Sequence, residues 1–303
     1  MTIPIIWHQP EISKSKAITA MICSAACWGL ATVMSKGALE LLPPISLLVA
    51  QLAASVAVLW LVVLATRQRI LLDRSARIAA LSGVLEPGLA YALGIGGLVM
   101  TTASNASLIS TTEPLVVISL AFVFFKVRTS RRQLATVLVA TVGVALVSFE
   151  QSDAKARIAG DALIAAATIF AALYVVITSR LVLRTPPLVL AVMQQTVGFV
   201  FAIAILAGAI ALGFEHIKTW PDANGWLLIF GSGIVQYALA FWFYLVALRA
   251  LPVSTAALFL ALIPVFGVSG AAIFLGETLS LVQLFGSTLI VVAVLASTAI
   301  IRQ

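Results

Sequence analysis

Apolar runs of about 20 residues, separated by short polar segments, make up most of this sequence. A helix of that length crosses the roughly 30 Å hydrocarbon layer of a bilayer. Within lipid, helices and closed barrels satisfy every backbone polar group, and barrel strands would show segments of about ten alternating residues. The sequence has no such alternation, and 10% of its 303 residues are charged, against roughly 25% in soluble domains. It therefore predicts an all-α integral membrane protein.

Ten such runs can be placed along the chain. They cover residues 17–36, 45–66, 76–99, 103–125, 132–149, 160–182, 187–211, 225–248, 253–275 and 281–300. Short cytoplasmic loops collect lysine and arginine, so the basic residues test this count. With both termini in the cytoplasm, 14 of the 18 basic residues fall in inside segments and four in outside segments. This distribution favours ten transmembrane helices with both termini cytoplasmic.

The first run is predicted to be a retained span. Lys14 and Lys16 precede an apolar run that is too long for the core of a cleavable signal. Residues 1–13 either lie along the inner surface of the membrane or form a disordered tail. Cys23 and Cys27, one turn apart in this span, are interpreted as small apolar side chains, because no metal or redox spacing surrounds them.

The two halves of the sequence resemble each other. At an offset of 150 residues, ten of the 32 positions in 103–134 are identical to those in 253–284. The identical pairs include Ser104 with Ser254, Pro114 with Pro264, and Gln133 with Gln283. A second offset, of 144 residues, pairs Pro43 with Pro187 and Gln51 with Gln195. Hydrophobicity alone does not explain polar and proline matches, so the sequence predicts an internal repeat.

Each half, 1–157 and 158–303, holds five of the predicted spans. Because five is an odd number, the halves must enter the membrane in opposite orientations. Two inverted five-helix repeats give a pseudo-two-fold axis in the membrane plane, with a binding site near the midplane between them. This architecture is typical of secondary transporters.

Several short motifs resemble those of the EamA-type exporters of the drug/metabolite transporter superfamily. They are Cys27-Trp28-Gly29-Leu30, the block Ala103–Val147, Val253-Ser254-Thr255-Ala256-Ala257 with Ile263-Pro264, and Leu275-Gly276-Glu277-Thr278-Leu279. The last is similar to a Gly-Glu motif of the family between the ninth and tenth spans. The first half has Lys126-Val127-Arg128 at that place, which favours a connecting or capping role for Glu277 over a mechanistic one.

This resemblance implies a function. Within the superfamily, the chain looks most like bacterial exporters of aromatic amino acids and related cationic or aromatic compounds. It implies efflux by alternating access through a central cavity lined by spans 1, 3, 4, 6, 8 and 9, in the inner membrane of a bacterium. The expected partners are the bilayer and a small-molecule substrate. No cofactor and no metal is expected, and the chain is expected to act as a monomer.

Two acidic residues lie deep within predicted spans. Glu86 and Glu113 each lie about ten residues, or roughly 15 Å, into their spans, and each precedes a proline, Pro87 or Pro114. Such a proline frees a backbone carbonyl, and acids within lipid are functional candidates by default. The pair could bind a cation, an ammonium group or a proton. A protonated glutamic acid that joins neighbouring helices is the alternative interpretation.

Aromatic and amide side chains away from the membrane interfaces form a second group of candidates. The predicted substrate-binding residues are Trp28, Glu86, Tyr91, Glu113, Tyr174, Gln194, Tyr237 and Trp242. Aromatic rings offer stacking to ring substrates and cation–π attraction to ammonium groups, and an amide can orient a carboxylate or an amine. Helix packing and helix-to-helix hydrogen bonding are the alternatives.

Other classes of protein fit the sequence less well. The net charge of +7 would favour nucleic acid in a soluble protein, but here the basic residues lie between spans, so no nucleic-acid partner is predicted. An enzyme would need a catalytic constellation, and the two histidines, His8 and His216, lie outside the predicted spans. A passive channel would show rings of charge or a carbonyl filter. An exporter of cationic drugs or other metabolites stays open, whereas nucleotide-sugar substrates would call for a basic site.

Overall fold

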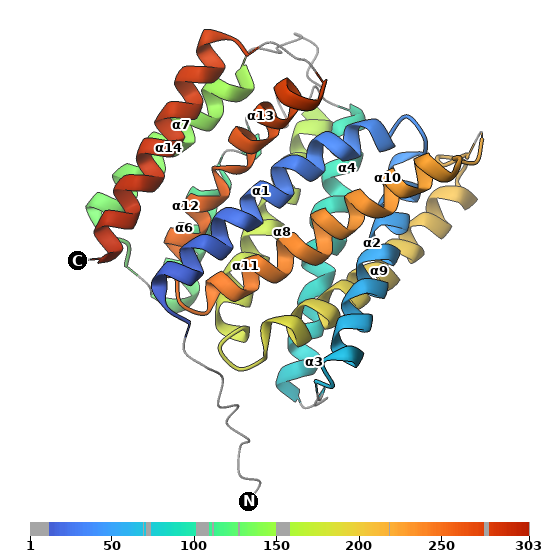
Figure 1. Cartoon of the computed structure of the whole chain (residues 1–303), viewed down its shortest axis with the longest axis horizontal. Helices are drawn as coiled ribbons and strands as arrows, with labels where there is room; N and C mark the ends of the chain where they lie inside the picture. Colours follow the sequence, from blue (N-terminus) through green and yellow to red (C-terminus); the bar gives the residue numbers. More distant parts are fainter. Residues whose placement is uncertain are drawn as a thin grey trace, which may run out of the picture.

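Helices packed side by side form the computed structural model of the chain (Figure 1), which describes residues 12–68, 70, 74–100, 109–110, 112–126, 128–149, 158–217, 219–275 and 279–302. In the first half these are α1 (Lys14–Ala38), α2 (Pro44–Ala65), α3 (Arg74–Leu81), η1 (Ser82–Val84), η2 (Leu85–Leu89), α4 (Ala90–Met100), α6 (Glu113–Phe125) and α7 (Arg131–Phe149). In the second half they are α8 (Ile158–Leu181), α9 (Pro187–Ala211), α10 (Ala223–Gly233), η3 (Ile234–Leu239), α11 (Ala240–Leu248), α12 (Val253–Leu260), α13 (Ile263–Leu275) and α14 (Leu281–Arg302).

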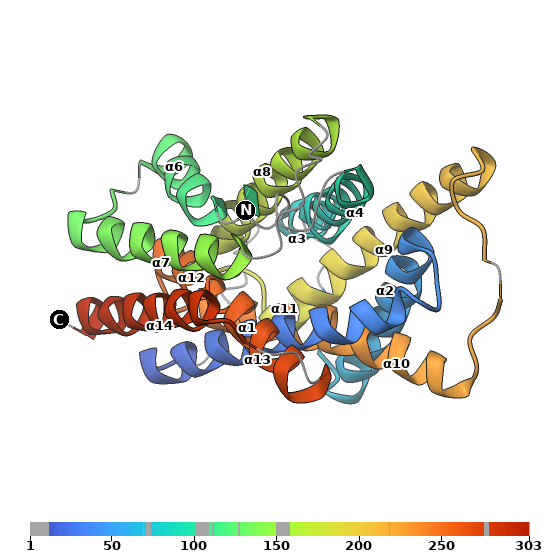
Figure 2. The same ribbon diagram turned by 90° about the horizontal axis from the view of Figure 1, so that it is seen from above.

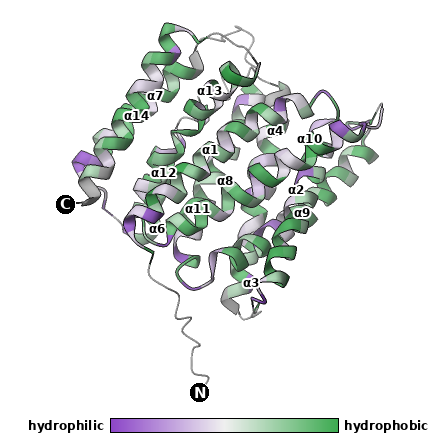
Figure 3. Cartoon of the chain, viewed as in Figure 1, coloured by the Kyte–Doolittle hydropathy of each residue, from purple (hydrophilic) through white to green (hydrophobic). Residues whose placement is uncertain are grey.

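The all-helical prediction is confirmed for the described part of the chain. There, seven helices are long and apolar enough to cross a membrane, and Glu113–Phe125 and Leu281–Ser297 are shorter apolar helices. Helical residues lie in each of the ten predicted runs, although part of the fourth run, residues 103–108 and 111, lies outside the described residues. Figure 3 shows hydrophobic residues along the lengths of the helices and hydrophilic residues toward many of their ends. This is the distribution that lipid demands of a spanning bundle.

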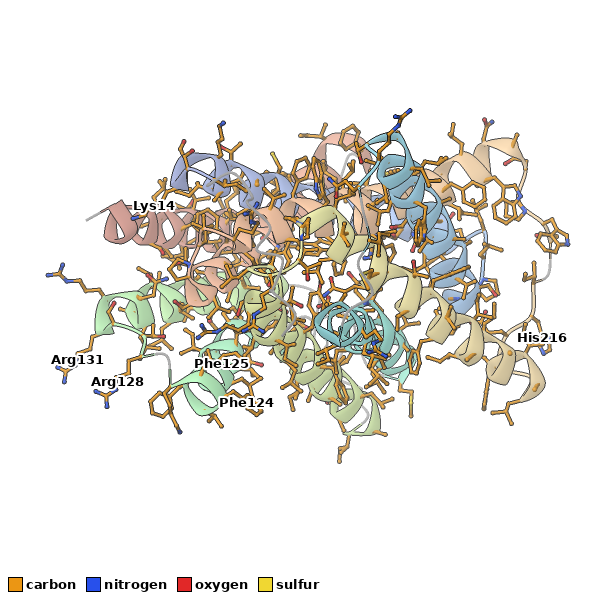
Figure 4. All side chains as sticks on the ribbon, turned by 90° about the horizontal axis from the view of Figure 1, so that it is seen from below. Lys14, Phe124, Phe125, Arg128, Arg131 and His216 are labelled. Atoms are coloured by element: carbon orange, nitrogen blue, oxygen red, sulfur yellow. The ribbon has the colours of Figure 1, made fainter. Side chains whose placement is uncertain are left out.

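Charged side chains mark the two ends of the bundle. Figure 4 places Lys14, Arg128 and Arg131 toward one end and His216 at the opposite end. The start of α1 and the end of α14 also lie at the same end of the bundle (Figure 1). An even number of crossings requires this arrangement.

The helices pack in pairs that are related between the two halves. Helix α1 packs against α11 and α13, and α8 packs against α4 and α6 in the same way. The packing of α2 against α10 corresponds to the packing of α9 against α3. Two further pairs, α2 with α9 and α7 with α14, each join matching helices of the two halves. Seen from above, α4, α6 and α8 lie in one layer and α1, α11 and α13 in the other (Figure 2). Each contact has its counterpart, so the molecule consists of two inverted five-helix repeats.

The α7–α14 pair shows the inversion directly. Gln133, near the start of α7, donates from Nε2 to the Ser297 Oγ near the end of α14, at 3.0 Å. Farther along, Gly143 and Gly286 face each other, and a Cβ on either glycine would lie 2.6–2.7 Å from the carbonyl oxygen of the other. Early residues of one helix thus meet late residues of its partner, so the two helices are antiparallel.

The buried side-chain amide of Gln51, in α2, joins α2 to α1 and α10. The Gln51 Nε2 donates to the Ser35 Oγ at 2.9 Å and to the Ser232 Oγ at 2.8 Å, and Ser35 donates to the Gln236 Oε1 at 2.9 Å. We call these four residues the Gln51 cluster. It links α1 and α2 of the first half to α10 and η3 of the second half.

The second half contains the matching arrangement. The Gln194 Nε2 donates to the Ser82 Oγ at 2.8 Å and to the Thr178 Oγ1 at 3.2 Å, and its Oε1 accepts from the Tyr174 hydroxyl at 3.0 Å. We call these four residues the Gln194 cluster. It links α8 and α9 of the second half to η1 of the first half, so both clusters cross the interface between the repeats.

These clusters correct the second sequence offset by one residue. Gln51 corresponds to Gln194 rather than to Gln195, since the two amides make matching bonds 143 residues apart. Likewise, Pro43 and Pro186 are the N-cap residues of α2 and α9. Each proline is followed by a second proline, and Gln194 is followed by a second glutamine, so the sequence alone leaves the alignment ambiguous by one position.

Candidate functional site

The third span is interrupted at Glu86. The helix passes through η1 into η2, a π-helical turn, and the Glu86 backbone inside this turn is extended, with φ −149° and ψ 125°. The sequence predicted that Pro87 frees a backbone carbonyl here, and the structure shows that Glu86 itself leaves the helical conformation. The second half has a π-helical turn at the corresponding place, η3, in which Gln236 lies 150 residues after Glu86. Such turns within spanning helices often occur at functional sites.

Aromatic rings from both halves pack together near this interruption. They are Trp28 of α1, Tyr91 of α4, Tyr174 of α8, Tyr237 of η3, and Phe241 and Tyr244 of α11, and we call them the aromatic cluster. Ring centroids are 5.1 Å apart for Trp28 and Phe241, 5.7 Å for Trp28 and Tyr244, and 5.1 Å for Tyr91 and Tyr237. Edge and tilted contacts at such distances are favourable.

The Glu86 carboxylate belongs to this cluster. It lies within electrostatic range of the hydroxyls of Tyr91, Tyr174, Tyr237 and Tyr244, and also of the Glu113 carboxylate. The two acids predicted to lie at one depth are therefore close enough to interact electrostatically. Among the residues that the structure describes, no basic side chain interacts with the rings of the aromatic cluster or with this acidic pair, so ionisation of either acid gives the site a negative charge.

Glu113 lines a cavity of about 280 Å³ between the repeats. It is the first residue of α6, and Ile263, which also lines the cavity, is the first residue of α13. Pro114 and Pro264 follow them, so both helices begin at the wall of the cavity. Thr32 of α1 also lines it, and its hydroxyl donates to the Trp28 carbonyl at 2.9 Å. The cavity thus lies within one helical turn of the aromatic cluster.

The structure separates one of the predicted site residues, Trp242, from this centre and places another, Gln194, at its edge. Trp242 is 37% exposed, packs its ring against Phe243 at 5.2 Å, and faces a groove with Lys16 on the outer side of α1. Gln194 is fully buried, and its Oε1 accepts directly from the hydroxyl of Tyr174, a member of the aromatic cluster, while its Nε2 donates to Ser82 of η1. The other six, Trp28, Glu86, Tyr91, Glu113, Tyr174 and Tyr237, lie around the interruption and the cavity.

Phe241 and Tyr244 were not among the predicted site residues. Helical spacing could have found them, because Tyr237, Phe241 and Tyr244 stand at i, i+4 and i+7 and share one face. Trp242, at i+5, points to another face, which agrees with its exposure. Within the described ranges, no group of three His, Cys, Asp or Glu residues could hold a metal ion.

The fold and this site define a class of protein. Two inverted repeats of membrane-crossing helices that meet around a cavity and two acids within the spans are the architecture of a polytopic membrane transporter. The model of the EamA-like transporter family matches residues 15–149 and again residues 158–299, so the chain belongs to this family and is a membrane transporter of small molecules.

Individual relatives agree with this assignment. The chain is 26% identical over 271 residues to an uncharacterized transporter of Archaeoglobus fulgidus, an alignment that covers 88% of this chain and 93% of the relative. A crystal structure of a protein superposes with a TM-score of 0.79 at 19% identity, covering 94% of this chain and 99% of that chain. At that level of identity, the second likeness concerns the fold alone.

Proposed function

We propose that the protein is a secondary transporter that exports small metabolites, chiefly amino acids with an aromatic preference, by alternating access through the central cavity. The observation that carries this proposal is the juxtaposition of Glu86 with rings from both repeats. A carboxylate in a cluster of tyrosines attracts an ammonium group, and the rings add stacking and cation–π attraction. The proposed setting is the inner membrane of a bacterium, with both termini cytoplasmic and the chain acting as a monomer.

The chemistry of the site favours a substrate with a positive charge. Both acids lie in spanning segments, where charge is expensive unless it serves a bound partner. A purely anionic substrate would meet two carboxylates without a compensating cation in the cluster. Either acid can also carry a proton, which allows substrate binding and proton binding to compete at one place.

The pseudo-two-fold axis supports alternating access. In both halves, a spanning helix is interrupted by a π-helical turn, at η2 and at η3, and the cavity lies between helices of both halves. Interruptions at matching depths let the same movement occur from either side of the membrane. Alternating access of this kind is typical of inverted repeats.

Replacement of Glu86 by glutamine tests the proposal. In liposomes preloaded with unlabelled L-phenylalanine, wild-type protein should show saturable uptake of the labelled amino acid, because exchange through a carrier saturates. Glu86→Gln should lower that uptake at least tenfold, since it removes the negative partner of the ammonium group while keeping the side chain's size. Both proteins should reach the membrane in equal amounts.

Glu40→Gln is the matched control. Glu40 is exposed just beyond α1, so its replacement should leave uptake unchanged. Unchanged flux in Glu86→Gln would contradict the proposed role of the acid. Flux that never saturates with substrate concentration would instead indicate a passive channel.

An exporter of cationic aromatic drugs is a second candidate, because Glu86 and the aromatic cluster recognise a ring and a cation without requiring a carboxylate. Competition by ring-bearing amines in the same liposomes separates the two candidates. An amine that competes as strongly as the corresponding amino acid would favour the drug exporter.

A further inference from the structure

Two hydrogen-bond donors of the aromatic cluster are buried without a partner. The indole Nε1 of Trp28 and the hydroxyl of Tyr244 have no hydrogen-bond partner among the described residues, and Tyr244 is 1% exposed. Their rings touch, with centroids 5.7 Å apart. A buried donor without an acceptor costs about 1–3 kcal/mol, so native proteins rarely leave two side by side.

Acceptors lie close to these donors without being used. Tyr244 lies within electrostatic range of Glu86 and Glu113, yet its hydroxyl donates a hydrogen bond to neither carboxylate. The Tyr91 hydroxyl lies beside the Trp28 indole, but the pair is not in hydrogen-bonding geometry. The two donors therefore remain available to a molecule that enters the cluster.

The neighbouring tyrosine shows the contrasting case. Tyr174 belongs to the same cluster and packs on Phe241 with centroids 5.9 Å apart. Its hydroxyl donates to the Gln194 Oε1 at 3.0 Å, so its hydrogen-bonding capacity is used within the protein. The unpaired state is thus a property of Trp28 and Tyr244 and not of every polar group in the cluster.

We propose that the Trp28 Nε1–H and the Tyr244 O–H bind the carboxylate of the substrate while Glu86 binds its ammonium group. The ligand is then an aromatic zwitterion, and an amine that lacks the carboxylate is discriminated against. This inference rests on the proposed transport function and specifies the substrate chemistry of the same site. A site built to hydrogen-bond a ligand group rejects the analogue that lacks the group, because its own buried donors then stay unpaired.

Competition with three related ligands tests this inference. Uptake of labelled L-phenylalanine into liposomes would be measured against unlabelled L-phenylalanine, its methyl ester and phenethylamine, with wild-type protein and with Tyr244→Phe. In wild type, L-phenylalanine should compete at least about tenfold better than phenethylamine, as expected for hydrogen bonds to a charged group. Tyr244→Phe should weaken competition by L-phenylalanine about tenfold and leave competition by phenethylamine unchanged.

Tyr174→Phe is the matched control for stability, since it also removes one hydroxyl from the cluster. It should lower the melting midpoint, because the Gln194 Oε1 loses its donor. Glu40→Gln, at an exposed position outside the site, should keep the wild-type preference for L-phenylalanine over phenethylamine. The melting midpoint of Tyr244→Phe should stay at or above that of wild type, because the lost hydroxyl has no partner.

The outcomes distinguish this inference from the proposed function. If Tyr244→Phe weakened competition by L-phenylalanine and by phenethylamine equally, the hydroxyl would have no role in binding a carboxylate. The proposed transport of aromatic substrates would not be affected by that result. Equal competition by the amino acid and the amine in wild type would overturn the binding of a carboxylate by these donors and favour the exporter of cationic aromatic drugs. If no aromatic ligand competes in wild type, both the proposed function and this inference fail.

Discussion

Two glycines allow the closest approach between the repeats. A Cβ on Gly83 would collide with the backbone of Gln194, and a Cβ on Gly233 would lie 2.5 Å from the Gln51 backbone. Each contact lies beside a buried amide that bonds across the interface. Hydrogen bonds inside the bilayer need close backbones, so the glycine and the glutamine act together at each of the two sites.

Gly83→Ala is therefore expected to destabilise the protein. The obstructing atoms are backbone atoms that cannot turn aside, so η1 and α9 must separate and the Gln194 amide must lengthen its bonds. We expect a loss of about 2–3 kcal/mol, in the range of overpacked cores, measured as a lower melting midpoint in detergent. Gly96→Ala is the control, because no atom lies within 4 Å of a Cβ there. Equal midpoints for the two variants would contradict the prediction.

For single residues, the sequence identifies candidate site residues by their type better than it predicts which residues they contact. Glu86 and Glu113 stand out because acids are costly in lipid, and their proximity follows from equal depth in antiparallel spans. Trp242 was grouped with the cluster because its position within a span does not fix the face on which it lies. The unpaired state of Tyr244 depends on atoms of α1 and η2, which lie far from it in sequence, and no local pattern contains it.

Among the elements, α2 begins with an unusual cap. Its N-cap residue, Pro43, offers no side-chain hydrogen bond. Glu215, which follows α9, is buried and accepts from the Ile45 N–H at 2.9 Å, from the Ser46 N–H at 3.2 Å and from the Ser46 hydroxyl at 2.8 Å. A carboxylate at this place complements the positive end of the helix dipole. The segment after α9 thus holds the start of α2 in place.

Glu215→Ala should lower the melting midpoint. It removes three hydrogen bonds and leaves the first N–H groups of α2 without a side-chain acceptor, a loss of about 1–3 kcal/mol for bonds to a charged group. Ser46→Ala, which removes one of the three, should have a smaller effect. Glu40→Ala, at an exposed position, should have none. Equal melting midpoints for Glu215→Ala and Glu40→Ala would show that the cap by Glu215 does not stabilise the protein.

Most helix boundaries were predictable because lipid imposes length and apolarity on every span. The start of α6 at Glu113, which the sequence placed ten residues inside a span, and the break between α12 and α13 within the ninth run were not predicted. The interruption at Glu86 was predictable in part, since Pro87 marks the place but not the extended backbone of the preceding residue. The cap by Glu215 was not predictable, because 169 residues separate it from Ser46 and nothing near either residue in sequence indicates the contact.

Over the whole molecule, neither repeat has a core of its own. Helix α1 packs against α11 and α13, and α8 packs against α4 and α6, so each half finds its main partners in the other half. The main core cluster accordingly mixes residues such as Met21 and Leu52 with Tyr174 and Phe259. The repeats are thus related in sequence and shape but depend on each other for folding.

Separate expression of residues 1–157 and 158–303 tests this dependence. Neither half alone should give a monodisperse protein in detergent, because each would expose the surfaces that normally pack on the other. Expressed together, the halves should copurify and recover L-phenylalanine exchange in liposomes. A single half that purifies as a folded monomer would show that the proposed division yields independent domains.

The matched interruptions of the third and eighth spans differ in charge. Gln236, a neutral amide, occupies the place of Glu86, and Ile263 occupies the place of Glu113. If the halves were identical, exchanging their conformations would turn the inward-facing form into the outward-facing form, and the two would have equal free energy. Any resting bias must come from positions where the halves differ. Glu86 and Glu113 are two such positions, and both belong to the first half, so the charge of the site lacks the two-fold symmetry of the fold.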